Sequence, residues 1–224
     1  MFNRNILIVD DEETTETISI KAYKRIFNFL KEQYAFNYNL NFIWKKSIKE
    51  ALDILGKKEQ VFDVLLIDYS FPNEVSNRKG VDLVKNIRRY INKRCKIVFY
   101  TMHALHEIEP EEYLELINND VFRLVPKDGQ LIKLKYVDSG HNTSDQLIVE
   151  ALIDALENLD PVSIALEKYI ANFSNIIDDL KISIEEKDYS IDEVLTSIRL
   201  FEHPGNKFVD NLLEMSIIEY LRLE

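Results

Sequence analysis

Cysteine, glycine, proline and long apolar runs are all scarce in this sequence of 224 residues. The single cysteine, Cys95, excludes an intramolecular disulfide and a cysteine-based zinc site, and it fits a reducing compartment. No stretch approaches the roughly 20 apolar residues that a membrane-spanning helix needs. Arg4 is followed by an apolar run of only four residues, which is too short for a secretory signal. We therefore expect a cytoplasmic protein with no membrane partner.

Positive charge is also in deficit. The sequence holds 28 Lys and Arg residues against 39 Asp and Glu residues, a net charge of −11. Residues 161–224 hold 6 basic and 13 acidic residues, a net charge of −7. A nucleic-acid-binding surface needs a basic patch. We therefore expect no nucleic-acid partner, which disfavours a transcription factor with a degenerate DNA-binding tail.

Short apolar runs of strand type end in polar side chains at four places in the chain. In chain order these side chains are the carboxylates of Asp10 and Asp11, the carboxylate of Asp68, the hydroxyl of Thr101 and the amine of Lys127. The runs alternate with helical patterns, which predicts a doubly wound parallel sheet. Because parallel strands end at one edge of a sheet, we expect these groups to converge there.

Three carboxylates crowded at one edge repel one another and favour binding of a divalent cation. Hard oxygen ligands with room for water suit Mg²⁺, which is the cofactor that we expect. A hydroxyl and an amine beside them suit a phosphoryl group. Each acid taken singly is explained equally well as a solvated strand end, so the prediction depends on the whole set.

These positions resemble those of the receiver domain of two-component response regulators. The segment Asp68-Tyr69-Ser70-Phe71-Pro72 fits the family's Asp-x-x-hydrophobic-Pro pattern, and Gly80 resembles the glycine that opens its third helix. The resemblance covers roughly residues 3–158. It implies an α/β, flavodoxin-like fold with a five-stranded parallel sheet in the order 2-1-3-4-5.

The resemblance also implies a role for each site residue. Asp68 would be the phosphoacceptor, Thr101 the switch hydroxyl, and Lys127 the partner of a phosphoryl oxygen. The implied direct ligands of Mg²⁺ are the side chains of Asp11 and Asp68 and the backbone carbonyl of Ser70. Asp10 would hold a metal-bound water. The partner implied is a histidine kinase or a phosphotransfer protein, and the chain would be a signalling protein rather than an enzyme.

Residues 160–224 resemble no family that we recognise, and their patterns predict a small all-α helical output module. Asp160-Pro161 interrupts the chain, so we place a receiver domain at 1–159 and the module at 160–224. Residues spaced alternately by four and three form an apolar seam: Val162, Leu166, Tyr169, Phe173, Ile176 and Leu180. The seam fits either the core of a helical bundle or the coiled coil of a homodimer.

Local patterns add detail to both domains. Alternating apolar residues predict a β-ribbon inserted at 130–142. A helix over about 14–33 carries Ile18, Ala22, Ile26 and Leu30 at every fourth position, which predicts its buried stripe. Ser190 and Glu193 form a capping box that opens a helix. Trp44 is expected in the core.

Two functional hypotheses remain. The first is a cytoplasmic response regulator that is phosphorylated on Asp68 in a Mg²⁺-dependent manner and signals to a downstream protein through its helical tail. The alternative is a receiver-like scaffold that binds its partners without phosphorylation.

Overall fold

The computed structural model describes residues 2–57, 60–72, 79–92, 95–101, 108–126, 144–162, 164–166, 169 and 181–222. The chain divides into two compact units, Met1–Ile91 with Cys95–Asn158, and Leu159–Glu224 with Asn92–Arg94. Among the described residues, no helix combines the length and the apolar character needed to cross a bilayer.

The first unit is built around a five-stranded parallel sheet in the order β2-β1-β3-β4-β5. The strands are β1 Phe2–Val9, β2 Tyr38–Lys45, β3 Val64–Asp68, β4 Lys96–Thr101 and β5 Arg123–Pro126. This strand order confirms the predicted flavodoxin-like sheet. It places β1 and β3 side by side at the point where the winding direction changes.

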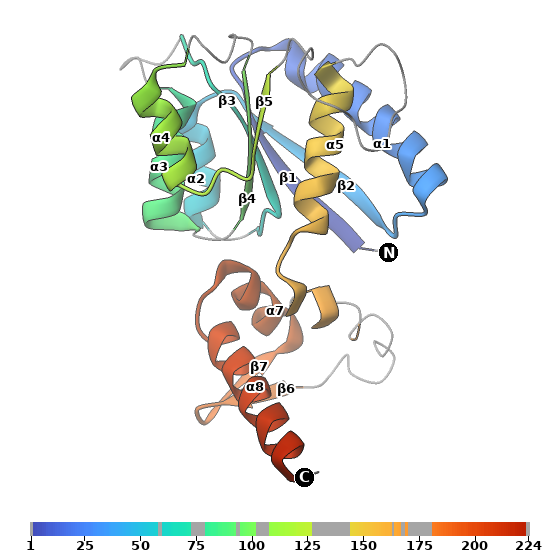
Figure 1. Cartoon of the computed structure of the whole chain (residues 1–224), viewed down its shortest axis with the longest axis vertical. Helices are drawn as coiled ribbons and strands as arrows, with labels where there is room; N and C mark the ends of the chain where they lie inside the picture. Colours follow the sequence, from blue (N-terminus) through green and yellow to red (C-terminus); the bar gives the residue numbers. More distant parts are fainter. Residues whose placement is uncertain are drawn as a thin grey trace. The chain divides into compact units, whose positions relative to one another are not determined.

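Helices cover both faces of the sheet (Figure 1). One face carries α1 Ile20–Tyr34 and α5 Ser144–Glu157. The other carries α2 Ile48–Lys57, α3 Gly80–Asn86 with the π-helical turn η2 Ile87–Ile91, and α4 Pro110–Asn118. Successive side chains of a strand point to opposite faces of the sheet, so each strand contributes apolar side chains to both layers between the sheet and the helices. β3 is therefore buried along its whole length.

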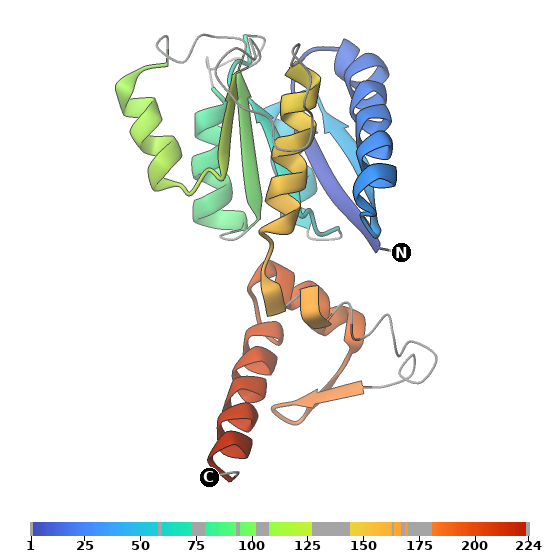
Figure 2. The same cartoon turned by 45° about the vertical axis from the view of Figure 1, so that its right-hand side comes forward.

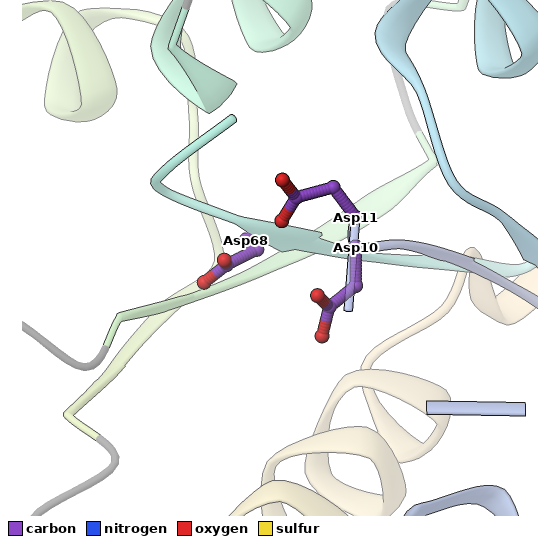
Figure 3. Close-up of side chains that lie close together, drawn as sticks. All are labelled: Asp10, Asp11 and Asp68. Carbon is purple, nitrogen blue, oxygen red and sulfur yellow. The ribbon is translucent and has the colours of Figure 1, made fainter. Parts of the chain in front are cut away.

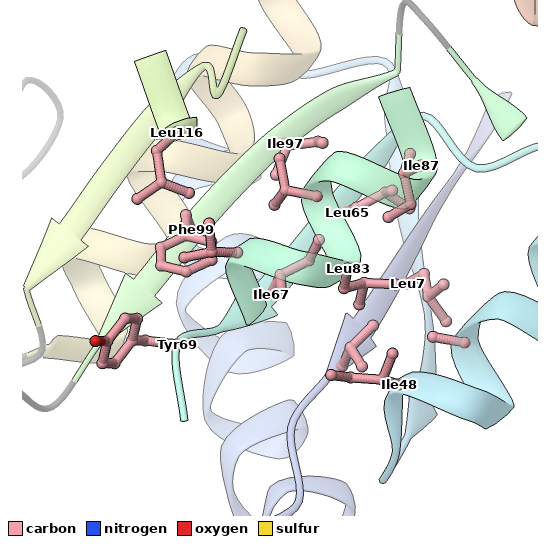
Figure 4. Close-up of a cluster of buried hydrophobic side chains, with 14 of the residues drawn as sticks. Leu7, Ile48, Leu65, Ile67, Tyr69, Leu83, Ile87, Ile97, Phe99 and Leu116 are labelled. Atoms are coloured by element: carbon pink, nitrogen blue, oxygen red, sulfur yellow. The ribbon is translucent and has the colours of Figure 1, made fainter. Parts of the chain in front are cut away.

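The core between the sheet and α2, α3 and α4 is aliphatic and aromatic (Figure 4). It includes Leu65, Ile67 and Phe99 from the central strands and Leu83 from α3, all fully buried. Because the odd-numbered residues of β3 and β4 enter this layer, the even-numbered ones face α1 and α5. This alternation determines which side chains surround the carboxyl ends of the strands.

Of the stripe predicted for the first helix, Leu30 is confirmed as buried, and the other three residues are wrong. Ile18 is 63% exposed, and Ala22 and Ile26 are only partly buried. The buried residues of α1 are Ile20, Tyr23, Phe27 and Leu30. A strict four-residue spacing drifts around a helix of 3.6 residues per turn, whereas alternating spacings of three and four stay on one face. Ile18 also lies outside α1, in the π-helical turn η1 Thr15–Ser19 that precedes it.

The second unit contains α7 Ile191–Leu200 and α8 Gly205–Arg222, which pack against each other. Ser190 caps α7 as predicted: its hydroxyl accepts from the Glu193 N–H at 3.2 Å, and the Glu193 carboxylate accepts from the Ser190 N–H at 2.8 Å. A small core is formed by Ile184, Val194 and Ile198, with Phe208 of α8 packed against it.

The second unit was predicted to be all-α, and the structure corrects this because the unit also contains two strands. Strands β6 Lys181–Ile184 and β7 Lys187–Ser190 form an antiparallel hairpin, drawn in orange in Figure 2. Its two-residue turn is Glu185-Glu186, and both residues have positive φ, at 50° and 66°. Such turns usually contain Asn-Gly or Asp-Gly. Two glutamates at these positions gave no hairpin signal, although Ile182 and Ile184 alternate as a strand requires.

Two predictions lie outside the described residues. They are the β-ribbon at 130–142 and most of the apolar seam that begins at Val162. Within the seam, Val162, Leu166 and Tyr169 are helical.

Candidate metal centre

Two adjacent strands deliver the three carboxylates to one edge of the sheet. Asp10 and Asp11 directly follow β1, and Asp68 is the last residue of β3. Val9 of β1 pairs with Ile67 of β3, so the two strands end at the same level. Figure 3 shows the result, with the carboxylates gathered beyond the strand ends. The predicted convergence of these three residues is therefore present.

The carboxylates are close together and largely withdrawn from water. One oxygen from each of Asp10, Asp11 and Asp68 lies within 4.8 Å of the others. Asp10 is 4% exposed and Asp68 is 7% exposed, while Asp11 is half-buried. Like charges at this separation in a poorly solvated site repel strongly. A bound cation would relieve that repulsion.

Protein donors surround the carboxylate of Asp10. Its Oδ1 accepts the Glu12 N–H at 2.9 Å. Its Oδ2 accepts the Thr15 hydroxyl at 3.1 Å and also the hydroxyl of Tyr100. A carboxylate offers about four lone-pair sites, so these three donors occupy most of them. Asp10 is therefore held in one orientation by its own fold.

Tyr100 is buried in β4 and keeps its proton. Burial raises the pKa of its hydroxyl well above the ordinary value, and the nearby charges of Asp10 and Asp68 raise it further. A protonated hydroxyl remains a hydrogen-bond donor. Tyr100 pairs with Asp68 across β3 and β4, which places it beside the carboxylates.

The backbone of Asp10 is also fixed. Its N–H donates to the Lys45 carbonyl at 3.1 Å, and its carbonyl accepts the Trp44 indole N–H at 2.8 Å. Trp44 is half-buried rather than a core residue, which corrects the prediction. An indole N–H needs a partner when it leaves water, and the strand end provides one.

The remaining predicted site residues are placed only in part. Thr101 ends β4 and is fully buried, and it pairs with Pro126 of β5. Lys127, the next residue along, lies outside the described residues. Ser70 follows Asp68 by two positions and is half-buried. Coordination by the Ser70 carbonyl stays a prediction.

A second polar group lies next to the site on the α3 and α4 side. The Tyr69 hydroxyl donates to Glu112 of α4 at 2.6 Å, and the Lys79 amine lies 2.9 Å from that hydroxyl and 2.7 Å from Glu112. Hydrogen bonds to Glu112 and Tyr69 raise the pKa of Lys79. The group ties α4 to the residue that follows Asp68.

Sequence reasoning missed the donors around Asp10. Thr15 and Tyr100 carry hydroxyls, but nothing in their spacing distinguishes them from packing residues. One signal was present for Tyr100, because alternation places it on the same face of the sheet as Asp68. That signal identifies the face of the sheet and does not identify Asp10 as the partner of the hydroxyl.

The donor set fits a hard divalent cation. All the side-chain ligand atoms are carboxylate oxygens, and the group contains no thiolate or imidazole. Oxygen ligands favour Mg²⁺, Ca²⁺ or Mn²⁺ over softer metals. The side chains best placed to bind such an ion directly are Asp11 and Asp68, because the donors described above already engage both oxygens of Asp10.

No protein-family model matches the chain, and no curated protein does. Several solved structures are similar, mostly receiver domains and response regulators. The phosphorylated cyanobacterial phytochrome response regulator RcpA is 13% identical, with a TM-score of 0.48 over 70% of this chain and 95% of that one. The Mn²⁺-bound response regulator Rcp1 is 13% identical, with a TM-score of 0.47 over 70% and 97%.

The non-phosphorylated HemR receiver domain of Leptospira biflexa is 20% identical, with a TM-score of 0.45 over 70% of this chain and 98% of that one. The fold assignment rests on the strand order of the chain itself. By that order the first unit has a flavodoxin-like fold, and the carboxyl edge of its sheet carries a cluster of three acids suited to a divalent cation.

Proposed function

We propose that the first unit is a receiver domain that accepts a phosphoryl group on Asp68 in a Mg²⁺-dependent manner. The observation that carries this proposal is the placement of Asp68 within 4.8 Å of Asp10 and Asp11 at the carboxyl edge of the sheet. A carboxylate on the central strand, beside two others, is placed to hold a cation and to react. The phosphodonor would be a histidine kinase or a phosphotransfer protein.

The reaction is a phosphoryl transfer between two side chains. A carboxylate oxygen of Asp68 forms a bond to phosphorus as the bond from phosphorus to the donor's imidazole nitrogen breaks. The released imidazole then takes up a proton from solvent. When bound, the cation offsets the repulsion between the carboxylates and the incoming phosphoryl oxygens.

Each neighbouring residue has a task in this proposal. Asp11 and Asp68 bind the cation, and Ser70 offers its backbone carbonyl. Asp10 holds a metal-bound water. The Thr101 hydroxyl donates to one phosphoryl oxygen and the Lys127 amine pairs with another. Movement of Thr101 toward the phosphoryl group would then change the surface near β4, which is a local event biasing a two-state element.

We infer that the signal leaves through protein–protein contacts of the second unit. Residues 161–224 carry a net charge of −7, which opposes association with the phosphates of a nucleic acid. The partner would be a downstream protein, and the helical tail could also pair two copies as a homodimer. The chain itself would have no enzymatic output and would act in the cytoplasm.

The proposal is tested by intact-mass measurement after incubation with acetyl phosphate and Mg²⁺. Wild type should gain the mass of one phosphoryl group, and the gain should vanish with a chelator. Asp68→Asn should gain nothing, because it lacks the nucleophilic oxygen. Asp53→Asn, which changes the same charge at an exposed position on α2, should behave as wild type.

Two results would contradict the proposal. Equal gains in wild type and Asp68→Asn would place the phosphoryl group on another residue. No gain in any variant, together with no thermal stabilisation by beryllofluoride and Mg²⁺, would favour the scaffold that binds partners without phosphorylation.

A further inference from the structure

The hydroxyl of Tyr100 occupies a specific place beside the metal centre. Tyr100 is 1% exposed and lies on the face of the sheet covered by α1 and α5. Its aromatic ring fills the layer as any large core residue would. Its hydroxyl, however, reaches Asp10 and donates to Oδ2. An apolar core position would not need that group.

Three buried or half-buried carboxylates at one sheet edge pose a problem of orientation as well as charge. A carboxylate that is free to turn cannot hold a metal-bound water at a fixed position. Asp10 is prevented from turning, because Thr15 and Tyr100 hold Oδ2 while the Glu12 N–H holds Oδ1. These donors are neutral, so they fix the carboxylate without cancelling its charge.

We propose that Tyr100 is a positioning residue of the metal centre, which with Thr15 holds Asp10 in the orientation that lets it hold a metal-bound water while Asp11 and Asp68 bind the cation. The inference rests on the proposed Mg²⁺ site. It gives a role to the buried hydroxyl of Tyr100, which the packing of the strand alone does not require. Groups that hydrogen-bond to a metal site from outside typically contribute 10- to 100-fold in metal affinity.

The test compares two buried tyrosines whose hydroxyls have different hydrogen-bond partners. Tyr100→Phe removes the hydroxyl on Asp10 and keeps the ring. Tyr23→Phe is the matched control, because Tyr23 is also buried and also lies within reach of the charges of Asp10 and Asp68, but its hydroxyl hydrogen-bonds to Ser19. Both substitutions delete one buried hydroxyl. Only the first acts on the metal centre if the proposal is right.

Trp44 provides the readout. It is the only tryptophan in the chain, and its indole N–H donates to the Asp10 carbonyl at 2.8 Å. Its fluorescence is therefore suited to following titration with MgCl₂. The EPR signal of free Mn²⁺ gives a second, independent Kd. We expect the Kd of Tyr100→Phe to rise about 10-fold or more, with Tyr23→Phe unchanged from wild type.

An unchanged or tighter Kd in Tyr100→Phe would overturn the inference, as would an equal loss in Tyr23→Phe. If wild type binds no divalent cation, the proposed function fails too; if wild type binds and Tyr100→Phe binds equally, only this inference fails. If Tyr100→Phe does not fold, substitutions of Thr15, the other hydroxyl donor to Asp10 Oδ2, test the same role. Thr15→Val should weaken binding and Thr15→Ser should retain it, because serine keeps the hydroxyl; equal Kd values for the pair would refute the role.

Discussion

Gly80 lies against the backbone of Asp68 at the end of β3, and its replacement by alanine would disturb the acidic edge of the sheet. Gly80 is the first residue of α3, and its N–H donates to the Tyr69 carbonyl at 2.9 Å. A Cβ atom built there would lie 2.0 Å from the Asp68 carbonyl oxygen and 3.0 Å from Cε2 of Phe99. The absence of a side chain therefore allows α3 to start directly beside the end of β3.

The size of the effect follows from that distance. Carbon and carbonyl oxygen make favourable contacts no closer than about 3.3 Å, so Gly80→Ala would force the backbone apart by about 1.3 Å. Neither neighbour can yield freely, since one is strand backbone and the other is a fully buried ring. Overpacking of this kind typically costs about 1–3 kcal/mol. We expect the free energy of unfolding to fall by that amount.

Gly56 offers the opposite case within the same unit. It is the second-to-last residue of α2, and a Cβ there would meet nothing within 4 Å. Gly56→Ala should therefore raise the free energy of unfolding by up to about 0.5 kcal/mol, because alanine favours a helix over glycine and the effect is largest in the middle of a helix. Urea unfolding followed by Trp44 fluorescence measures both, since the single tryptophan reports on the first unit. Gly80→Ala as stable as wild type, or both variants shifted alike, would refute the reasoning.

Further predictions concern charged pairs and caps. Asp63→Ala should lower the free energy of unfolding by about 3–5 kcal/mol in urea, because it leaves the buried Arg4 guanidinium, 3.5 Å from Asp63, without that carboxylate. The Lys79–Glu112 pair is partly exposed, so a double-mutant cycle with Lys79→Met and Glu112→Gln should give a coupling of no more than about 1 kcal/mol. The backbone and hydroxyl hydrogen bonds of Ser190 lower the pKa of Glu193. The stability advantage of wild type over Glu193→Gln should therefore be complete above the ordinary pKa, about 4.3, and lost as the pH falls through the lower folded pKa. A thermal-melting series against pH checks this, and an advantage that persists in strong acid would contradict it.

The sheet was predictable because each strand can be recognised from the apolar character of its own residues. Runs such as Val64–Ile67 are apolar without interruption, as strands buried on both faces must be. Each run ends at a polar residue or a break, so the carboxyl edge could be read from the sequence. The convergence of Asp10, Asp11 and Asp68 follows once the strands are parallel.

Contacts that depend on orientation could not be predicted. The hydroxyl of Tyr100 reaches Asp10, a residue 90 positions away, through the register of three strands. Residues 69, 79 and 112 likewise meet only after α3 and α4 have packed. Periodicity identifies which face a residue occupies, but it does not identify which polar atom it contacts there.

The two wrong predictions of secondary structure concern the first helix and the hairpin of the second unit, and each has its cause within that segment. The first helix was assigned a buried stripe at four-residue intervals, although its 3.6-residue turn rotates such a stripe away from the core. The hairpin of the second unit was missed because Glu185 and Glu186 adopt positive φ without the glycine or asparagine that usually marks such a turn. The first error is therefore one of helical periodicity, and the second arises because the turn forms without the residue types that usually mark it.

Mapping the modified residue determines whether Asp68 receives the phosphoryl group. Protein treated with acetyl phosphate and Mg²⁺ would be reduced with borohydride, which converts an aspartyl phosphate to homoserine, and then digested and sequenced by tandem mass spectrometry. We expect homoserine at position 68, with Asp10 and Asp11 unchanged. Homoserine at either of those residues, or at none of the three, would show that Asp68 is not the phosphoacceptor.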